Sequence, residues 1–112
     1  MNILFLDDNK KRQKDFRNKV PSAKIVSTAE VCINNIQKEE VWNILFLEGE
    51  TCGGTEIARW IVENEPQVRN IIVHAQDPDI GMEMVQLLKG AQYQASYMPF
   101  STMIKNMEKV NG

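Results

Sequence analysis

Short runs of apolar residues alternate along this chain with longer segments in which apolar residues recur every three or four positions. The runs predict five buried strands, and the periodic segments predict five helices. The expected strands lie near residues 3–6, 23–26, 44–47, 71–73 and 94–98, and the expected helices near residues 10–19, 29–36, 55–64, 78–90 and 101–110. Strict alternation of strands and helices requires parallel pairing through right-handed crossovers, and therefore predicts a three-layer α/β fold around one doubly wound sheet.

Short polar residues before the periodic segments predict where the helices begin, because their side chains accept hydrogen bonds from free backbone N–H groups. For the second helix, Ser27 also stands at capping-box spacing from Glu30. Gly90 is expected to follow the end of the fourth helix. The expected N-terminal caps are Asp8 or Asn9, Ser27, Asp77 and Ser101. The residues expected to face inward from the last helix are Met103, Ile104, Met107 and Val110.

The first and third expected strands end abruptly in carboxylates. Asp7 and Asp8 follow the first strand, and Glu48 and Glu50 follow the third. A flavodoxin-like strand order, 2-1-3-4-5, would bring all four acids to one crevice at the carboxyl edge of the sheet, where ligands bind in such folds. Their mutual repulsion favours a bound cation. We therefore expect these four acids to hold Mg²⁺ or Mn²⁺, the alternative being that they face water and cap helices.

Further candidates stand at the same expected edge. His74, the one histidine, ends the fourth strand, and we expect it to act with Glu48 as a catalytic residue or phosphate contact, the alternative being a structural hydrogen bond. Gly53 and Gly54 allow a close backbone approach to phosphate, and Gln76 precedes a helix whose N–H groups attract anions. A cation facing such a helix suits a phosphate ester. Because neither GxxxxGK[ST] nor GxGxxG is present, nucleoside triphosphates and dinucleotides are disfavoured.

The composition fits a globular protein and changes the expectations in few places. With 112 residues, 43% hydrophobic and 25% charged, the chain suits one domain over residues 1–112. Its apolar runs are far shorter than the roughly 20 residues of a bilayer span, and no secretory signal is recognisable, so we expect a cytoplasmic location and no membrane partner. A net charge of -2 gives no argument for binding duplex nucleic acid. Cys32 and Cys52 are expected to be unpaired thiols.

Several segments together resemble the receiver domains of two-component response regulators, over nearly the whole chain. They are the Ile3–Asp8 strand end, the Asn43–Leu47 strand followed by an acid, and Pro99-Phe100. The closer likeness is to the cyclic-phosphate processing receiver domains. The segments that carry it are Leu6-Asp7-Asp8, Gly53-Gly54, Ala58-Arg59-Trp60, Ile71 to His74 and Leu87 to Tyr93. The resemblance implies a flavodoxin-like fold and the binding or hydrolysis of a cyclic phosphate at a metal site.

The chain also departs from these families. Glu48, His74 and Met98 stand where ordinary receivers have the phosphoaccepting Asp, a Ser or Thr, and a Lys before Pro, so phosphorelay signalling is not expected. The cyclic-phosphate family typically ends the third strand in Asp-His-Asp, and this chain has Glu-Gly-Glu over residues 48–50. The carboxylates for a metal are thus kept, and the central histidine is lost.

Two functions therefore stay open. The first is metal-dependent binding or processing of a phosphate ester, such as a cyclic nucleotide. The second is a non-catalytic pseudo-receiver that binds a protein partner through the methionine-rich last third of the chain or through the basic first helix. A monomer or a weak homodimer fits either function.

Overall fold

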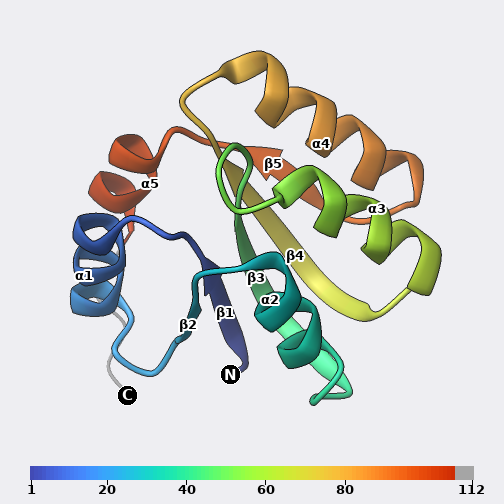
Figure 1. Cartoon of the computed structure of the whole chain (residues 1–112), viewed down its shortest axis with the longest axis horizontal. Helices are drawn as coiled ribbons and strands as arrows, with labels where there is room; N and C mark the ends of the chain where they lie inside the picture. Colours follow the sequence, from blue (N-terminus) through green and yellow to red (C-terminus); the bar gives the residue numbers. More distant parts are fainter. Residues whose placement is uncertain (108–112) are drawn as a thin grey trace.

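The computed structural model describes residues 1–107, in which five parallel strands and five helices alternate (Figure 1). The strands are β1 (Ile3–Leu6), β2 (Lys24–Val26), β3 (Val41–Glu48), β4 (Gln67–His74) and β5 (Ala95–Tyr97). The helices are α1 (Lys10–Lys19), α2 (Ala29–Ile36), α3 (Gly54–Asn64), α4 (Pro78–Gly90) and α5 (Phe100–Asn106). The sheet has the order β2-β1-β3-β4-β5, which confirms the predicted flavodoxin-like topology.

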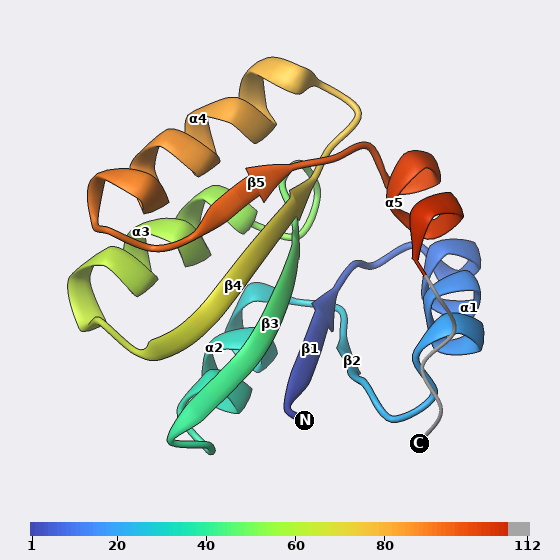
Figure 2. The ribbon, with the colours of Figure 1, turned by 180° about the vertical axis from the view of Figure 1, so that it is seen from behind.

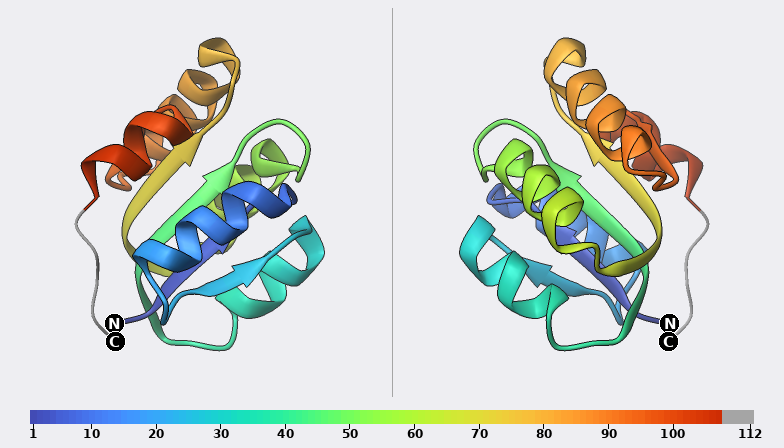
Figure 3. Two further views of the ribbon diagram at one scale, coloured as in Figure 1. Left: turned by 90° about the vertical axis from the view of Figure 1, so that its left-hand side faces the viewer. Right: turned by 90° about the vertical axis from the view of Figure 1, so that its right-hand side faces the viewer.

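The helices cover both faces of the sheet. In Figure 3, α1 and α5 face the viewer in the left-hand view, and α2 and α3 do so in the right-hand view. The side chains of each strand alternate between the two faces: Phe5 and Phe46 pack with Phe16 beneath α1 and α5, while Leu6 and Leu47 join the core beneath the other helices. Because both faces are buried, β1 and the end of β3 read as continuous apolar runs.

Two strands are longer than their apolar runs. β3 begins at Val41 and β4 at Gln67, and these two residues are paired in register. Figure 2 shows the two strands side by side. Gln67, Arg69 and Asn70 are exposed, so the first half of β4 carries no apolar signal. Its membership in the sheet comes from backbone pairing with β3, which the sequence pattern does not record.

The helix caps were predicted correctly at two of four positions. The Asn9 side chain caps α1 by accepting from the Arg12 N–H at 2.9 Å, and Asp77 caps α4. The prediction of Ser27 was wrong: Thr28 caps α2, because the Ser27 hydroxyl instead accepts from Gln13 Nε2 at 3.0 Å.

Two further predictions at helix ends were also wrong. Ser101 lies inside α5, which begins after Pro99 and has no side-chain cap. Gly90 is the last residue of α4, and the left-handed backbone conformation falls at Gln92, where φ is 72°. Met103 is buried as expected, whereas Val110 lies outside the described residues. Among the helices of residues 1–107, none has the length and apolar character needed to cross a bilayer.

Candidate functional site at the carboxyl edge of the sheet

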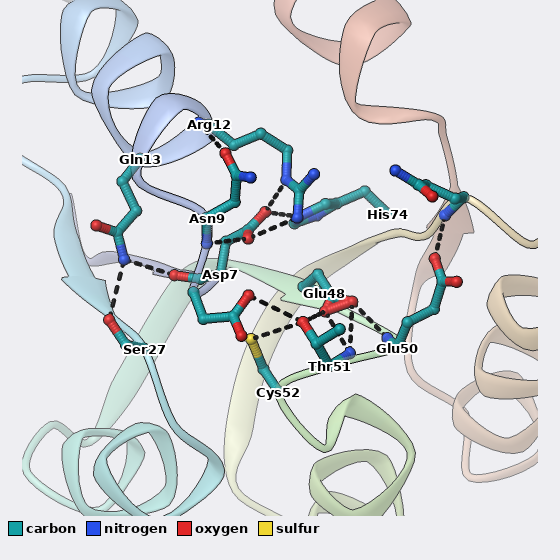
Figure 4. A network of polar contacts seen from close by, with 12 residues as sticks. Asp7, Asn9, Arg12, Gln13, Ser27, Glu48, Glu50, Thr51, Cys52 and His74 are labelled. Carbon is teal, nitrogen blue, oxygen red and sulfur yellow. Dashed lines mark hydrogen bonds and ion pairs between the residues drawn. The ribbon is translucent and has the colours of Figure 1, made fainter.

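The carboxyl ends of β1, β3 and β4 meet at one edge of the sheet (Figure 4). Leu6 of β1 pairs with Leu47 of β3, and Glu48 pairs with His74 of β4. The residues that follow β1 and end β3 and β4 are therefore neighbours, although they are far apart in sequence. Parallel pairing alone brings Asp7, Glu48 and His74 together.

Asp7 is fully buried and is held by basic side chains from two other elements. Arg12, in the first turn of α1, donates from Nε to Oδ2 at 2.6 Å and from Nη2 to Oδ1 at 3.0 Å. His74 Nε2 lies 2.8 Å from Oδ2, and the Asn9 N–H donates to Oδ1 at 2.9 Å. Each carboxylate oxygen thus accepts two hydrogen bonds, which fills the roughly four acceptor positions of the group.

These contacts shift the acid–base properties of the pair. Burial raises the pKa of Asp7, but the hydrogen bonds from His74, Arg12 and the Asn9 backbone outweigh burial and lower this pKa to about 2. The hydrogen bond to Asp7 in turn raises the pKa of Arg12. Both groups are charged at neutral pH. Asp7 is therefore the anchor of an ion pair that connects β1 to α1.

Gln13 supports the same turn from the other side. Its Nε2 donates to the Asp7 carbonyl oxygen at 2.6 Å and to the Ser27 hydroxyl at 3.0 Å. Gln13 is buried, as expected for a side chain that satisfies backbone beneath a helix. Sequence reasoning missed both Arg12 and Gln13: it considered the basic first helix only as an exposed surface that could bind a protein partner, and it gave Gln13 no role. The available signal was their place one turn after an acidic strand end.

Glu48 is also buried, but its carboxylate turns back onto its own loop. It accepts hydrogen bonds from the backbone N–H of Glu50 and from the backbone N–H of Thr51 at 2.9 and 3.0 Å. The Thr51 hydroxyl lies 3.1 Å from Glu48 Oε2 and 2.9 Å from Oδ1 of the exposed Asp8. The charge of Glu48 is therefore balanced by local backbone dipoles, in contrast to that of Asp7.

Glu50 does not join the other three acids. Its carboxylate accepts from the backbone N–H of Gln76 and, at 3.4 Å, from that of Asp77. It connects the loop after β3 to the loop after β4. Of the four acids expected to hold one ion, only Asp7 and Asp8 belong to a group of ligand atoms that lie close together among the described residues.

A possible cation site is formed instead by Asp7, Asp8 and Cys52, whose ligand atoms lie within 4.8 Å of one another. The two carboxylates suit Mg²⁺ or Mn²⁺, and the thiol suits a softer ion. Burial raises the pKa of the Cys52 thiol to about 12, so the free protein presents it protonated. The donor set thus fits a divalent cation in chemistry, although Asp7 already has other partners. Cys52 was expected as an unpaired loop thiol, the alternative being a disulfide or a metal site.

Next to these acids lies a pocket of about 490 Å³. His74, Glu48, Glu50 and Gln76 line it, whereas Gly53 and Gly54 do not. The residues that complete its wall are Arg12, Thr51, Ala75, Pro78, Tyr97, Pro99, Phe100 and Ser101. The lining therefore combines charged and apolar residues.

Gly53 and Gly54 serve the loop rather than the pocket wall. Gly53 has a φ of 76° and precedes α3, a conformation that favours glycine. Gly54 packs against the backbone of the loop, since a Cβ there would clash with the Glu48 carbonyl oxygen. The two glycines thus permit the tight turn in which Glu48 bonds its own loop.

His74 is placed for contact with both Asp7 and the pocket. Its ring is 2% exposed and stacks on Phe5, with ring centroids 5.4 Å apart. Because Asp7 is ionised, Nε2 carries the hydrogen that Asp7 accepts. Nδ1 is buried and has no hydrogen-bond partner among the described residues. Buried polar atoms are nearly always paired, so this unpaired nitrogen is a candidate contact for a ligand.

The strand order, the helices on both faces and the acids at the ends of β1 and β3 define a receiver-like domain. The sequence profile described as Cyclic-phosphate processing Receiver domain matches residues 2–90. The chain therefore belongs to the family of cyclic-phosphate processing receiver domains, as the resemblance predicted. No curated protein matches the chain.

Solved structures agree on the fold. The chain is similar to the N-terminal domain of a response regulator/sensory box/GGDEF 3-domain protein from Carboxydothermus hydrogenoformans, with a TM-score of 0.68 and 16% identity over 94% of this chain and 86% of that one. It is also similar to the BeF3-activated DrrB receiver domain, with a TM-score of 0.60 and 22% identity over 93% and 91% of the two chains. At these identities the likeness concerns the fold alone.

Proposed function

We propose that this protein binds a small phosphate ester of the cyclic-phosphate class, such as a cyclic nucleotide, in the pocket at the carboxyl edge of the sheet. The single observation that carries the proposal is that Arg12 and His74 line the same pocket, beside a cluster of acids suited to a divalent cation. The family assignment supports the choice of a cyclic phosphate. A pocket of about 490 Å³ also lies in the usual size range of small-molecule sites.

The roles of the wall residues follow from their chemistry. Arg12 has five N–H donors and uses two groups, Nε and Nη2, on Asp7, which leaves donors for phosphate oxygens. Pro78, Tyr97 and Phe100 supply an apolar wall for the organic part of the ester. Gln76, which also lines the pocket, is a neutral polar contact. Glu48, together with the metal candidates Asp7, Asp8 and Glu50, makes the edge acidic.

That acidity is the reason for including a cation. A phosphate anion would be repelled by this edge unless a positive charge offset the carboxylates. A divalent cation, Mg²⁺ or Mn²⁺, would be held by Asp7 and Asp8 with Cys52 nearby, and when bound it would neutralise charge on the phosphate. The more distant Glu48 and Glu50 are bound to backbone N–H groups, and in the proposal they contribute charge rather than direct ligation.

In hydrolysis of the ester, His74 would be the base. Asp7 fixes the ring by accepting from Nε2, which leaves Nδ1 to take a proton from water. The water oxygen would form a bond to phosphorus, one ring P–O ester bond would break, and the same proton would return from Nδ1 to the leaving alkoxide oxygen. Glu48 accepts hydrogen bonds from its own loop, and its part in catalysis would be electrostatic.

A second candidate is the non-catalytic pseudo-receiver that binds a protein partner. One observation favours it: the acceptor positions of Asp7 and the carboxylate of Glu48 are satisfied by the protein itself. Such a site needs no ligand to be stable. The first candidate function requires the pocket to bind a small anion, and the second does not.

The test is a titration of ¹⁵N-labelled protein with 2′,3′-cyclic AMP and 3′,5′-cyclic AMP, with and without MgCl₂, followed by ¹H–¹⁵N and ³¹P NMR. We expect shifts at the amides of Thr51, Gln76 and Ser101, and an affinity reduced about tenfold or more by Arg12→Gln. The matched control is Arg69→Gln, because Arg69 is exposed and lines a separate hollow with Val41 and Gln67.

Unchanged amide spectra with both nucleotides, with and without the metal, would contradict the proposal and leave the pseudo-receiver. Amide shifts with an unchanged ³¹P spectrum would show binding without hydrolysis. An equal loss of affinity in Arg12→Gln and Arg69→Gln would show that the nucleotide binds by charge alone, outside the pocket.

A further inference from the structure

We infer that Arg12 and a divalent cation are alternative partners of Asp7, so that binding of the cation releases Arg12 to the pocket. The inference rests on the proposed function, since it concerns how the same site accepts a metal and a phosphate ester. It goes further by assigning a switching role to Arg12. The argument begins with the acceptor positions of Asp7.

The two oxygens of Asp7 accept four hydrogen bonds, and two of these come from Arg12. A metal ion bonded to either oxygen needs a lone pair that is already in use. The contacts from His74 and the Asn9 backbone come from a buried ring and from the main chain. The Arg12 side chain is 26% exposed and ends a long, flexible chain, so its contact is the one that can be given up.

The charges around Asp7 also favour a single cationic partner. Arg12 is a permanent cation, and it already neutralises the carboxylate on which a metal would sit. Asp8 and Cys52 provide ligand atoms within 4.8 Å of an Asp7 oxygen, so a cation among the three would be close to the guanidinium as well. A cation and the Arg12 guanidinium that lie this close together repel each other. Asp7 is therefore expected to bind one of them at a time.

Arg12 can also contact a second partner, a ligand in the pocket. Besides contacting Asp7 it lines the pocket, which Pro78, Tyr97 and Phe100 also line. Once a cation is bound to Asp7, the Arg12 guanidinium keeps its charge, and its Nε and Nη2 donors become available to another acceptor. A phosphate in the pocket is the natural new partner, so metal and phosphate ester should increase each other's affinity.

The first experiment measures Mn²⁺ binding by titration calorimetry, with no ester present, to wild type, Arg12→Gln and Lys11→Gln. Both variants remove one positive charge from the start of α1. Lys11 is exposed and contacts Asp15 at 3.0 Å rather than Asp7, so its variant controls for general electrostatics. We expect Arg12→Gln to bind Mn²⁺ about tenfold tighter than wild type or more, and Lys11→Gln to stay within about twofold.

Equal affinity of wild type and Arg12→Gln, or an equal gain in Lys11→Gln, would overturn the inference. So would the lack of Mn²⁺ binding by all three proteins. In that last case, amide shifts with a cyclic nucleotide in the absence of metal would still uphold the proposed binding function, so the two failures are distinguishable. Arg12→Gln is expected to have opposite effects on the two ligands, tighter for Mn²⁺ and weaker for the nucleotide.

A second measurement uses wild type only, in case Arg12→Gln does not fold. The Nε–H of Arg12 gives its own ¹⁵N resonance, and its hydrogen bond to Asp7 protects it from exchange with water. Saturation with MgCl₂, judged from the amides of Asp8 and Thr51, should shift this resonance or broaden it beyond detection. An unchanged Arg12 resonance at saturation would overturn the inference.

Discussion

Asp7 and Glu48 stand at neighbouring strand ends, and both are buried carboxylates, yet the protein satisfies them in different ways. Asp7 accepts from side chains of α1 and β4, so its contacts connect three separate elements. Glu48, one methylene longer, bends back to the N–H groups of the loop that follows it. A carboxylate held by remote side chains stabilises tertiary structure, while one held by adjacent backbone shapes a local turn. Their removal should therefore have unequal consequences.

Replacement of Asp7 should give the largest effect. In Asp7→Asn the Arg12 guanidinium and the buried His74 lose their anion, and the amide places an N–H₂ where both donors point. Breaking such a pair from one side costs about 3 kcal/mol of unfolding free energy. Urea denaturation measures it. The control Asp15→Asn, which removes only the contact to the exposed Lys11, should cost less than about 0.5 kcal/mol, and a similar loss in both would contradict the comparison.

The pH dependence of the same pair gives the next largest effect. The pKa of Asp7 is lowered from 3.8 to about 2 in the folded state, so the folded protein holds the ionised form more strongly than the unfolded chain does. This stabilisation is complete above the unfolded pKa and is lost as the pH falls from about 5 to about 2. The loss is about 2 kcal/mol.

The measurement is the difference in unfolding free energy between wild type and Asp7→Asn across that range. The difference should shrink by the stated amount towards low pH, because only wild type has a carboxylate at this position to protonate. A difference that stays constant between pH 5 and pH 2 would show that the ion pair of Asp7 with Arg12 does not cause the loss of stability at low pH.

Replacement of Glu48 should cost less than that of Asp7. In Glu48→Gln the amide oxygen at the Oε1 position still accepts from the N–H groups of Glu50 and Thr51. The amide nitrogen replaces Oε2, where the Thr51 hydroxyl can turn to accept from it while donating to Asp8, so the main loss is the charge assistance. We expect a loss of about 1 kcal/mol in urea denaturation. Glu40→Gln, at an exposed position, is the control and should be neutral. If Glu48→Gln were as damaging as Asp7→Asn, the distinction between remote and local satisfaction would fail.

The comparison also explains how far the sequence could be interpreted. Strand order was predictable because two apolar runs end in acids, and ligand sites gather where such ends are adjacent. The direction of Glu50 was not predictable, since its partner is the backbone N–H of Gln76 in a loop 26 residues away. Arg12 was read as part of a basic helix surface, because helical periodicity records which residues face the core and not which reach past the end of the helix to a strand. The position of Cys52 near Asp7 and Asp8 was not predictable either, because it depends on how the loop of Cys52 folds.

Asp8 offers the smallest change in stability and the clearest separation of structure from binding. It directly follows Asp7 but is exposed, and its carboxylate contacts only the Thr51 hydroxyl among the side chains of residues 1–107. Asp8→Asn should therefore change the unfolding free energy by less than about 0.5 kcal/mol. Mn²⁺ affinity, measured by calorimetry, should nevertheless fall about tenfold or more, since an amide replaces one of two carboxylate ligands. A variant that unfolds as easily as Asp7→Asn would place Asp8 in the structural network, whereas normal stability with unchanged Mn²⁺ affinity would remove it from the metal site.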